Sequence, residues 1–178
     1  MGTADRHTLR LIAFASSLLL LGASGDPGVL LELDRDTYLV VARDLRAGVD
    51  GPGLRVALGS PAHPTPTGSF PLREVVHSPG WSPGPTARSN GASPERPSLE
   101  GPLGAAKIPF LGAFSLHGGS RPLLLGKPIT LGCLRSADPE LLELLAWLGQ
   151  QGALGAERPL ASGESRQAFV RPARLVIR

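Results

Sequence analysis

One cysteine and one histidine of this 178-residue chain stand in segments whose composition suits nucleophilic chemistry. His117 opens the sequence His-Gly-Gly, and Cys133 follows sixteen residues later within Thr-Leu-Gly-Cys-Leu-Arg. A thiol is a useful nucleophile only as its thiolate, and a nearby imidazole can lower the thiol pKa and take up the proton. Two strands joined by a loop of this length can bring their ends together. We therefore predict that Cys133 is a nucleophile and that His117 is its base.

The residues that flank Cys133 suit the binding of a negatively charged reaction partner. Gly132 lets the backbone approach the cysteine closely, so that neighbouring N–H groups could bind an oxyanion. Arg135 follows two residues after the cysteine, where its guanidinium could hold a substrate carboxylate.

Other readings of these residues stay open. An unpaired cysteine can be a small buried apolar side chain, and a histidine taken alone is more often structural. His63 and His77 lie close to prolines in loops, and we expect both to be exposed to solvent. One cysteine and scattered histidines lack the spacing of a metal site, so we predict neither a metal nor another cofactor.

Strands must position these residues. Apolar runs at 29–32 and 38–42 and an alternating run at 54–58 predict an antiparallel meander, with turns at 34–36 and 48–53. Further strands are predicted at the positions 69–76, 107–116, 129–134, 168–170 and 175–177.

Residues 77–104 are rich in Pro, Gly and Ser, and strand-like sequence resumes after them. We expect this segment to be a loop or lid over the Cys133 site, because long loops inside compact domains are usually functional.

A helix is predicted to begin at Asp138, with Asp138 as its N-cap and Pro139 in its first turn. Trp147 is placed at the edge of its apolar face, which consists of Leu141, Leu142, Leu144, Leu145 and Leu148. The chain as a whole is therefore predicted to be mainly β with one helix.

The N-terminal segment resembles a signal peptide. Arg6 and Arg10 precede an apolar run at 11–21, and small residues follow up to position 25. Residues 1–25 are therefore predicted to be a signal peptide, with His7 inside it, and export to the periplasm or cell wall follows. Membrane association is expected only if this segment stays uncleaved. The net charge is +3 with no basic run, which argues against nucleic acid as a partner.

The motifs around the cysteine resemble those of the L,D-transpeptidase (YkuD-like) family, whose signature is His-Gly-x, a spacer and Ser/Thr-x-Gly-Cys-x-Arg. This chain reads HGGSRPLLLGKPITLGCLR from His117 to Arg135. A Thr-Pro-x-Gly turn upstream is matched at 65–68, and the segments WSPGP from Trp81 and GPLG from Gly101 look like the family's substrate-facing loop. The resemblance implies a catalytic domain at 28–178, a β-sandwich or barrel of mixed sheets with one helix after the cysteine motif.

The resemblance also implies roles for individual residues. Cys133 is the nucleophile, His117 is the general base and acid, and the backbone carbonyl of Gly118 orients the imidazole. The implied substrate contacts are Arg135, Thr130, Gly132 and Trp81. Three residues depart from the pattern at positions 119, 131 and 136, where this chain has Gly, Leu and Ser. These departures bear on the choice of acceptor more than on the nucleophile.

The implied activity is acyl transfer on peptidoglycan stem peptides, through a thioester on Cys133 with release of D-Ala and transfer to an amine. Two alternatives stay open. One is a carboxypeptidase or endopeptidase of the same fold that hydrolyses wall peptides, and the other is an inactive wall-binding domain. We expect a monomer.

Overall fold

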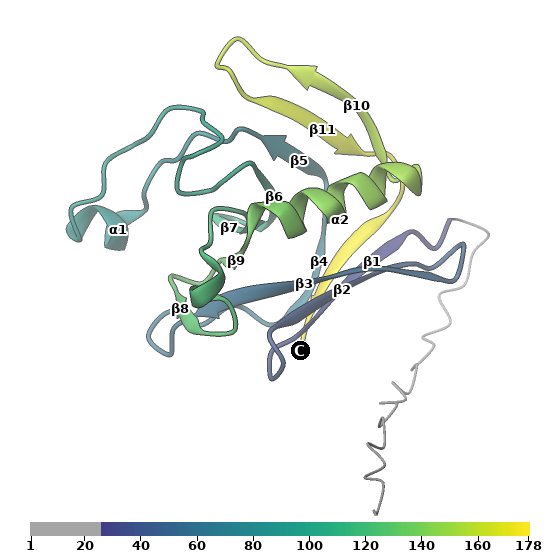
Figure 1. Cartoon of the computed structure of the whole chain (residues 1–178), viewed down its shortest axis with the longest axis horizontal. Coiled ribbons are helices and arrows are strands. Elements are labelled where there is room, and N and C mark those ends of the chain that lie inside the picture. Colours follow the sequence, from purple (N-terminus) through teal and green to yellow (C-terminus); the bar gives the residue numbers. More distant parts are fainter. Residues whose placement is uncertain (1–25) are drawn as a thin grey trace, which may run out of the picture.

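The structure is a computed structural model that describes residues 26–178. The predicted signal peptide, with His7, lies outside the described residues. The described part is mainly β with one long helix, as predicted from the sequence (Figure 1). Within it, no helix combines the length and the apolar character needed to cross a membrane.

The predicted antiparallel meander is confirmed. It consists of β1 (Val29–Asp34), β2 (Leu39–Asp44) and β3 (Val49–Gly59), with β2 paired to both neighbours. The predicted turn at 48–53 is wrong, because the chain reverses at 45–48 and β3 runs through the Gly-Pro-Gly sequence that follows. Glycine is needed there, since a Cβ at Gly51 would collide with the indole of Trp147.

Two segments predicted as single strands are each divided into two. The run 69–76 forms β4 (Gly68–Pro71) and β5 (Glu74–His77), which pair with different partners far apart in the sheet. The run 107–116 forms a hairpin of β6 (Ala106–Leu111) and β7 (Phe114–His117). Gly112 allows the reversal with a φ of 52°, a conformation that glycine adopts without strain.

The run predicted at 129–134 is likewise divided, into β8 (Pro128–Thr130) and β9 (Leu134–Ser136), with the Cys133 turn between them. The last strands are β10 (Leu154–Pro159), β11 (Ser165–Phe169) and β12 (Ala173–Ile177). The sequence patterns predicted the last two but missed β10, which has an exposed and charged surface.

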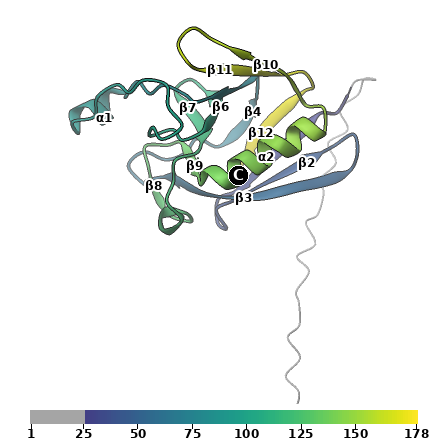
Figure 2. The same cartoon turned by 45° about the horizontal axis from the view of Figure 1, so that its top comes forward.

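The described strands form one curled, mixed sheet in the order β10-β11-β5-β6-β7-β9-β3-β2-β1-β12-β4, with β8 beside β3. Three pairings are parallel, namely β1 with β12, β3 with β8 and β7 with β9. The sheet curls around the apolar core, and the first and last strands of the chain lie side by side (Figures 1 and 2).

Helix α2 (Asp138–Gln150) packs on β3, β6 and β10 and lies across the sheet in Figure 2. Leu141, Leu144, Leu145 and Leu148 are buried in the core, and Trp147 packs at its edge, as predicted. Leu142 was predicted to share this face but is 45% exposed, because it points to the opposite side of the helix.

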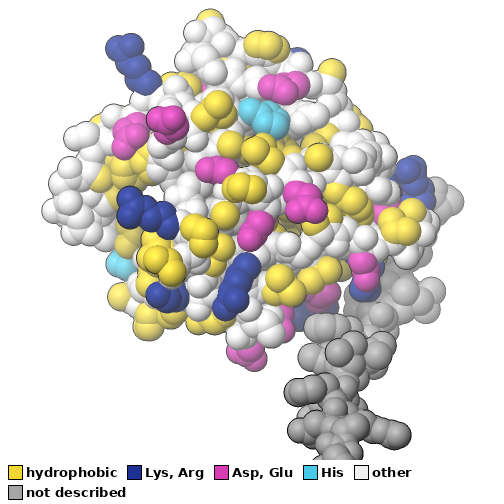
Figure 3. Space-filling model, viewed as in Figure 1, with side chains coloured by type: hydrophobic (Ala, Val, Ile, Leu, Met, Phe, Trp, Pro, Cys, Tyr) yellow, Lys and Arg dark blue, Asp and Glu magenta, His cyan; other side chains and the backbone are white. Residues whose placement is uncertain are grey.

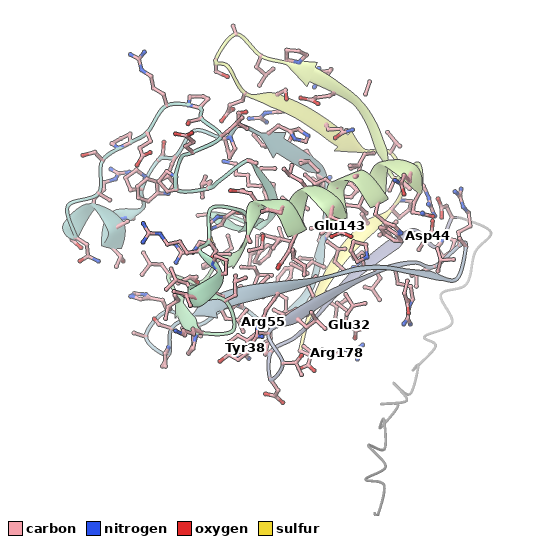
Figure 4. All side chains as sticks on the ribbon, viewed as in Figure 1. Glu32, Tyr38, Asp44, Arg55, Glu143 and Arg178 are labelled. Atoms are coloured by element: carbon pink, nitrogen blue, oxygen red, sulfur yellow. The ribbon has the colours of Figure 1, made fainter. Side chains whose placement is uncertain are left out.

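The surface carries charges of both signs. Figure 3 shows Lys and Arg side chains interspersed with Asp and Glu on one face of the molecule. One such pair joins the last strand to the first, because Arg178 lies 2.8 Å from Glu32, and the two side chains lie near each other in Figure 4.

Candidate active site

The parallel pairing of β7 with β9 brings the two predicted catalytic residues to one face of the sheet. Leu116 pairs with Leu134, and both side chains are buried in the core. Because side chains alternate along a strand, the neighbouring residues His117 and Arg135 point away from the core. Cys133 directly precedes β9, and its sulfur lies 4.0 Å from the hydroxyl of Ser115 on the same face.

His117 is buried and held by its neighbour. Its Nδ1 lies 2.8 Å from the carbonyl oxygen of Gly118, as the family resemblance implied. Since a carbonyl only accepts, Nδ1 carries the proton and Nε2 is left with a free lone pair. This tautomer is the one that can act as a base through Nε2.

The environment of His117 keeps the imidazole neutral. Its pKa is lowered from 6.5 to about 4, mainly because burial disfavours the charged form. The hydrogen bond to Gly118 opposes this shift, whereas the positive charges of Arg135 and Lys107 add to it. A neutral imidazole at neutral pH can accept a thiol proton.

Cys133 carries a free, half-buried thiol. Its sulfur contacts Ser115 Oγ at 4.0 Å and the carbonyl oxygen of Ala113 at 3.9 Å. Among the hydrogen bonds of residues 26–178, none joins this sulfur to His117. Catalytic hydrogen bonds are often long before substrate binds and shorten in the complex.

The turn before Cys133 is shaped by Thr130 and Gly132. The Thr130 hydroxyl donates to the carbonyl oxygen of Cys133 at 2.7 Å and accepts from the N–H of Gly132 at 3.1 Å. Gly132 has a φ of 111°, and a Cβ there would collide with the ring of Phe114. These contacts give both residues a part in positioning the cysteine. Their predicted contact with substrate stays a prediction, and neither lines the cleft of the described structure.

Cys133 opens on a cleft of about 690 Å³. Its floor includes Ser115 and Lys107, and one wall comes from the 77–104 loop, with Trp81 among its residues. Trp81 therefore lines the cleft, in the loop that the family resemblance implied to face the substrate, and its contact with substrate stays a prediction.

Arg135 is placed beside the base rather than in the cleft. It pairs in register with His117, and its Nε is buried without a hydrogen-bond partner in the described residues. Its predicted role as a carboxylate clamp stays a prediction.

The Pro/Gly-rich loop is ordered and forms a wall of the site. Trp81 and Glu95 exchange two backbone hydrogen bonds of 2.9 Å, which close the base of a segment containing α1 (Pro85–Ser89). Gly80 donates its N–H to the Glu164 carboxylate at 2.8 Å, which ties the loop to the β10–β11 hairpin. The expected loop beside the Cys133 site is therefore confirmed as a wall of the cleft, and its function as a lid stays a prediction. The loop includes α1 in Figure 1.

The prediction that His63 and His77 are exposed is wrong. Both are half-buried. His63 lines the cleft, because the Pro-rich turn folds back over β3. His77 contacts the side-chain oxygen of Gln167 at 3.2 Å on the neighbouring strand.

Three residues near the site were not identified from the sequence. Ser115 lies two residues before His117 on its strand, so strict alternation could have placed it in the cleft. Lys107 pairs in register with His117, which only the hairpin reveals. Asp138 was predicted to cap α2, but Ala137 occupies the N-cap position and no side chain caps the helix. The Asp138 carboxylate instead accepts from other segments, as described below.

No group of three or more His, Cys, Asp or Glu side chains that could hold a metal occurs within residues 26–178. The cleft contains a thiol, hydroxyls and carboxylates instead. A free thiol with a hydroxyl beside it suits nucleophilic chemistry.

The fold defines the class of this protein as a mainly β domain with the L,D-transpeptidase fold. An L,D-transpeptidase from Mycobacterium tuberculosis H37Rv matches with a TM-score of 0.54 at 12% identity, over 85% of this chain and 57% of its own. L,D-transpeptidase 3 from Mycobacterium tuberculosis matches with a TM-score of 0.54 at 13% identity, over 85% of this chain and 61% of its own. This chain therefore spans less than two thirds of the length of these structures.

Residues 29–157 match the sequence profile of the YkuD L,D-transpeptidase catalytic domain, and the chain belongs to this family. No curated protein matches it. The family resemblance found in the Cys133 and His117 motifs is thereby confirmed.

Proposed function

We propose that this protein is a peptidoglycan L,D-transpeptidase that uses Cys133 as its nucleophile. The observation that carries the proposal is the parallel pairing of β7 with β9, which puts the neutral His117 on the same face as Cys133 and Ser115, and these last two line the cleft. Family membership supplies the reaction class, and the geometry supports these residues as its machinery.

In the first half-reaction, Nε2 of His117 takes the thiol proton of Cys133, either directly or through the Ser115 hydroxyl. The thiolate attacks the carbonyl carbon of the diamino-acid residue that precedes the terminal D-Ala of a tetrapeptide stem. The C–N bond breaks, His117 returns its proton to the leaving amine, and D-Ala departs, which leaves a thioester. The N–H of Gly132 is engaged by Thr130, so the N–H of Cys133 is the candidate donor to the oxyanion.

In the second half-reaction, the amine of another stem attacks the thioester. His117 takes a proton from the attacking amine and returns it to the sulfur as the C–S bond breaks. The product is a new amide, and the thiol is regenerated. Water in place of the amine would make the same site a carboxypeptidase.

Charged side chains of the cleft suit such substrates. Lys107 lies on the floor, where its ammonium can attract a carboxylate of the donor stem. Glu95 of the loop and Glu164 of the β10–β11 turn also line the cleft, where they can attract the ammonium of an acceptor.

The test is to incubate the protein beginning at Asp26 with defined tetrapeptide muropeptides and to measure products and protein by mass spectrometry. We expect a crosslinked product, release of D-Ala and a covalent acyl-protein that Cys133→Ser abolishes. His117→Ala should abolish it as well, and the double variant should be little worse than either single variant, because the two residues act as one unit.

Other outcomes of the muropeptide experiment would assign a different function. Hydrolysed tripeptide without crosslinks would assign the protein as a carboxypeptidase. Binding of muropeptides without any acyl-protein would assign it as an inactive wall-binding domain. Full activity of Cys133→Ser would overturn the thiol mechanism in either form. Export to the periplasm or cell wall and a monomeric state stay predictions.

A further inference from the structure

Asp138 connects the start of α2 to two other segments of the chain. Its Oδ1 accepts from the N–H of Ala105 at 2.7 Å, directly before β6, and from the N–H of Gly119 at 3.2 Å, directly after β7. The carboxylate therefore points away from its own helix and toward the loop that follows His117. A charged acceptor makes stronger hydrogen bonds than a neutral one.

The peptide group between Gly118 and Gly119 carries this contact to the imidazole. The peptide is planar and trans, so that its C=O and its N–H point in opposite directions. On one side, its oxygen accepts from Nδ1 of His117 at 2.8 Å. On the other side, its N–H donates to Asp138. The two hydrogen bonds hold this planar peptide group at its oxygen and at its nitrogen. A rotation of the group that breaks one of these bonds therefore also displaces the other.

The surrounding glycines fit this arrangement. A Cβ at Gly118 or at Gly104 would collide with Oδ1 of Asp138. Gly104 and Gly119 also have positive φ values of 65° and 76°. Glycines therefore leave room for the carboxylate to reach the backbone at both segments.

We infer that Asp138 is a positioning residue that holds the Gly118 carbonyl and thereby keeps His117 in the tautomer with Nε2 free. The inference rests on the proposed function in that Nε2 is the base toward Cys133. Its test, however, measures directly which nitrogen of the His117 imidazole carries the proton. Failure of the muropeptide reaction would therefore not decide it.

The experiment compares Asp138→Ala with Asp138→Asn in the protein beginning at Asp26. The tautomer of His117 is read from the ¹⁵N chemical shifts of its two ring nitrogens, and the rate of Cys133 alkylation by iodoacetamide is followed against pH. For Asp138→Ala we expect a mixture of tautomers, a shifted pH profile and a turnover reduced by about 100-fold with little change in KM, because a small displacement of a catalytic group is costly. Asp138→Asn should retain the wild-type tautomer, since its amide oxygen can accept the same two bonds.

Glu140→Ala is the matched control. Glu140 is the other acidic residue of the first turn, and its removal takes the same charge from the helix N-terminus. It should lower stability slightly and leave the tautomer and the pH profile unchanged. The inference is overturned if Asp138→Ala keeps the wild-type tautomer and profile, if Asp138→Asn is as impaired as Asp138→Ala, or if Glu140→Ala has the same effect.

Wild-type protein provides a test that does not depend on a folded Asp138→Ala variant. We expect protonated Nδ1 on His117 and a scalar coupling across the hydrogen bond between the Gly119 nitrogen and the Asp138 carboxyl carbon. An Nε2–H tautomer, or the absence of this coupling, would contradict the inference.

Discussion

Burial of His117 determines both its chemistry and its contribution to stability. Desolvation lowers its pKa to about 4, so the folded protein binds no proton there at neutral pH. The unfolded chain regains the ordinary pKa of 6.5. Between these two values the unfolded state binds more protons than the folded state, so stability falls as the pH falls.

We therefore predict that the free energy of unfolding decreases by about 3 kcal/mol between pH 7 and pH 4 through His117 alone, at 1.36 kcal/mol per pKa unit. The variant His117→Gln should lack this part of the dependence of the free energy of unfolding on pH. Urea denaturation at pH 7, 5.5 and 4 measures both proteins. Identical slopes for the two proteins would show that His117 is not buried as a neutral base.

Lys107 influences the same imidazole through its charge. It pairs in register with His117 on the neighbouring strand, and its positive charge lowers the pKa of that histidine. Lys107→Met is expected to raise the pKa of His117, which an NMR titration of the His117 ring measures.

Lys127→Met is the control for that titration, because it removes the only other lysine of the chain from an exposed position before β8. It should leave the titration of His117 in place. An equal shift in both variants would point to net charge rather than to the contact on the sheet.

At the scale of secondary-structure elements, the sequence predicts whether a segment is a strand or a helix better than it predicts where that element begins and ends. The strands β1–β3 and helix α2 follow from local alternation and from apolar periodicity, which depend on neighbours in sequence. The division of the runs 69–76 and 107–116 into two strands each does not follow from neighbours in sequence. It depends on which partner each half finds, since β4 pairs with β12 whereas β5 pairs with β6 and β11.

The residues of the candidate site also differ in whether local sequence or tertiary structure reveals them. Cys133 and His117 could be identified because their motifs are local. Lys107 and Asp138 reach His117 only through a hairpin register and a tertiary hydrogen bond, and neither leaves a periodic signal in the sequence. Asp138 was assigned to its own helix because an aspartate before Pro-Glu is typical of an N-cap.

Arg171 connects several elements near the end of the chain. It is buried between β11 and β12 and donates to Asp44 at the end of β2, to Asp26 and to the carbonyl oxygen of Gln151 after α2. These bonds lower the pKa of Asp26 to about 2 and that of Asp44 further. Arg171 thus ties the segment before β1, the end of β2 and the end of α2 to the link that precedes β12.

Removal of Arg171 should leave the buried Asp44 without its partner. Arg171→Met is expected to lower the free energy of unfolding by about 3 kcal/mol, as when one partner of a buried ion pair is lost. Denaturant unfolding at pH 7 provides the measurement. Arg174→Met, at an exposed position on the next strand, should change it by less than about 0.5 kcal/mol. Equal losses in the two variants would contradict a special role for Arg171.

At the scale of the whole molecule, the curled sheet provides the floor of the cleft and the 77–104 loop provides a wall. The base of the loop is fixed twice, by the Trp81–Glu95 bridge and by the bond from Gly80 to Glu164. Between these points the chain carries Pro83, Pro85 and Pro94, which limit its conformational freedom. The loop is therefore suited to exclude water from an acyl group on Cys133.

The reciprocal hydrogen bonds of Trp81 and Glu95 allow a precise shortening of this wall. Replacing residues 82–94 by Asn-Gly should close the bridge as a two-residue hairpin and keep the base of the loop intact. We expect the shortened protein to form the thioester but to release more hydrolysed than crosslinked product, because water reaches the acyl group more easily. Mass spectrometry of the muropeptide products gives the ratio. A variant in which residues 82–94 are replaced by a Gly/Ser segment of the same length keeps the size of the loop but removes its ordered structure. It should shift the ratio in the same direction but by a smaller amount. An unchanged ratio in the shortened protein would show that the loop does not govern the acceptor.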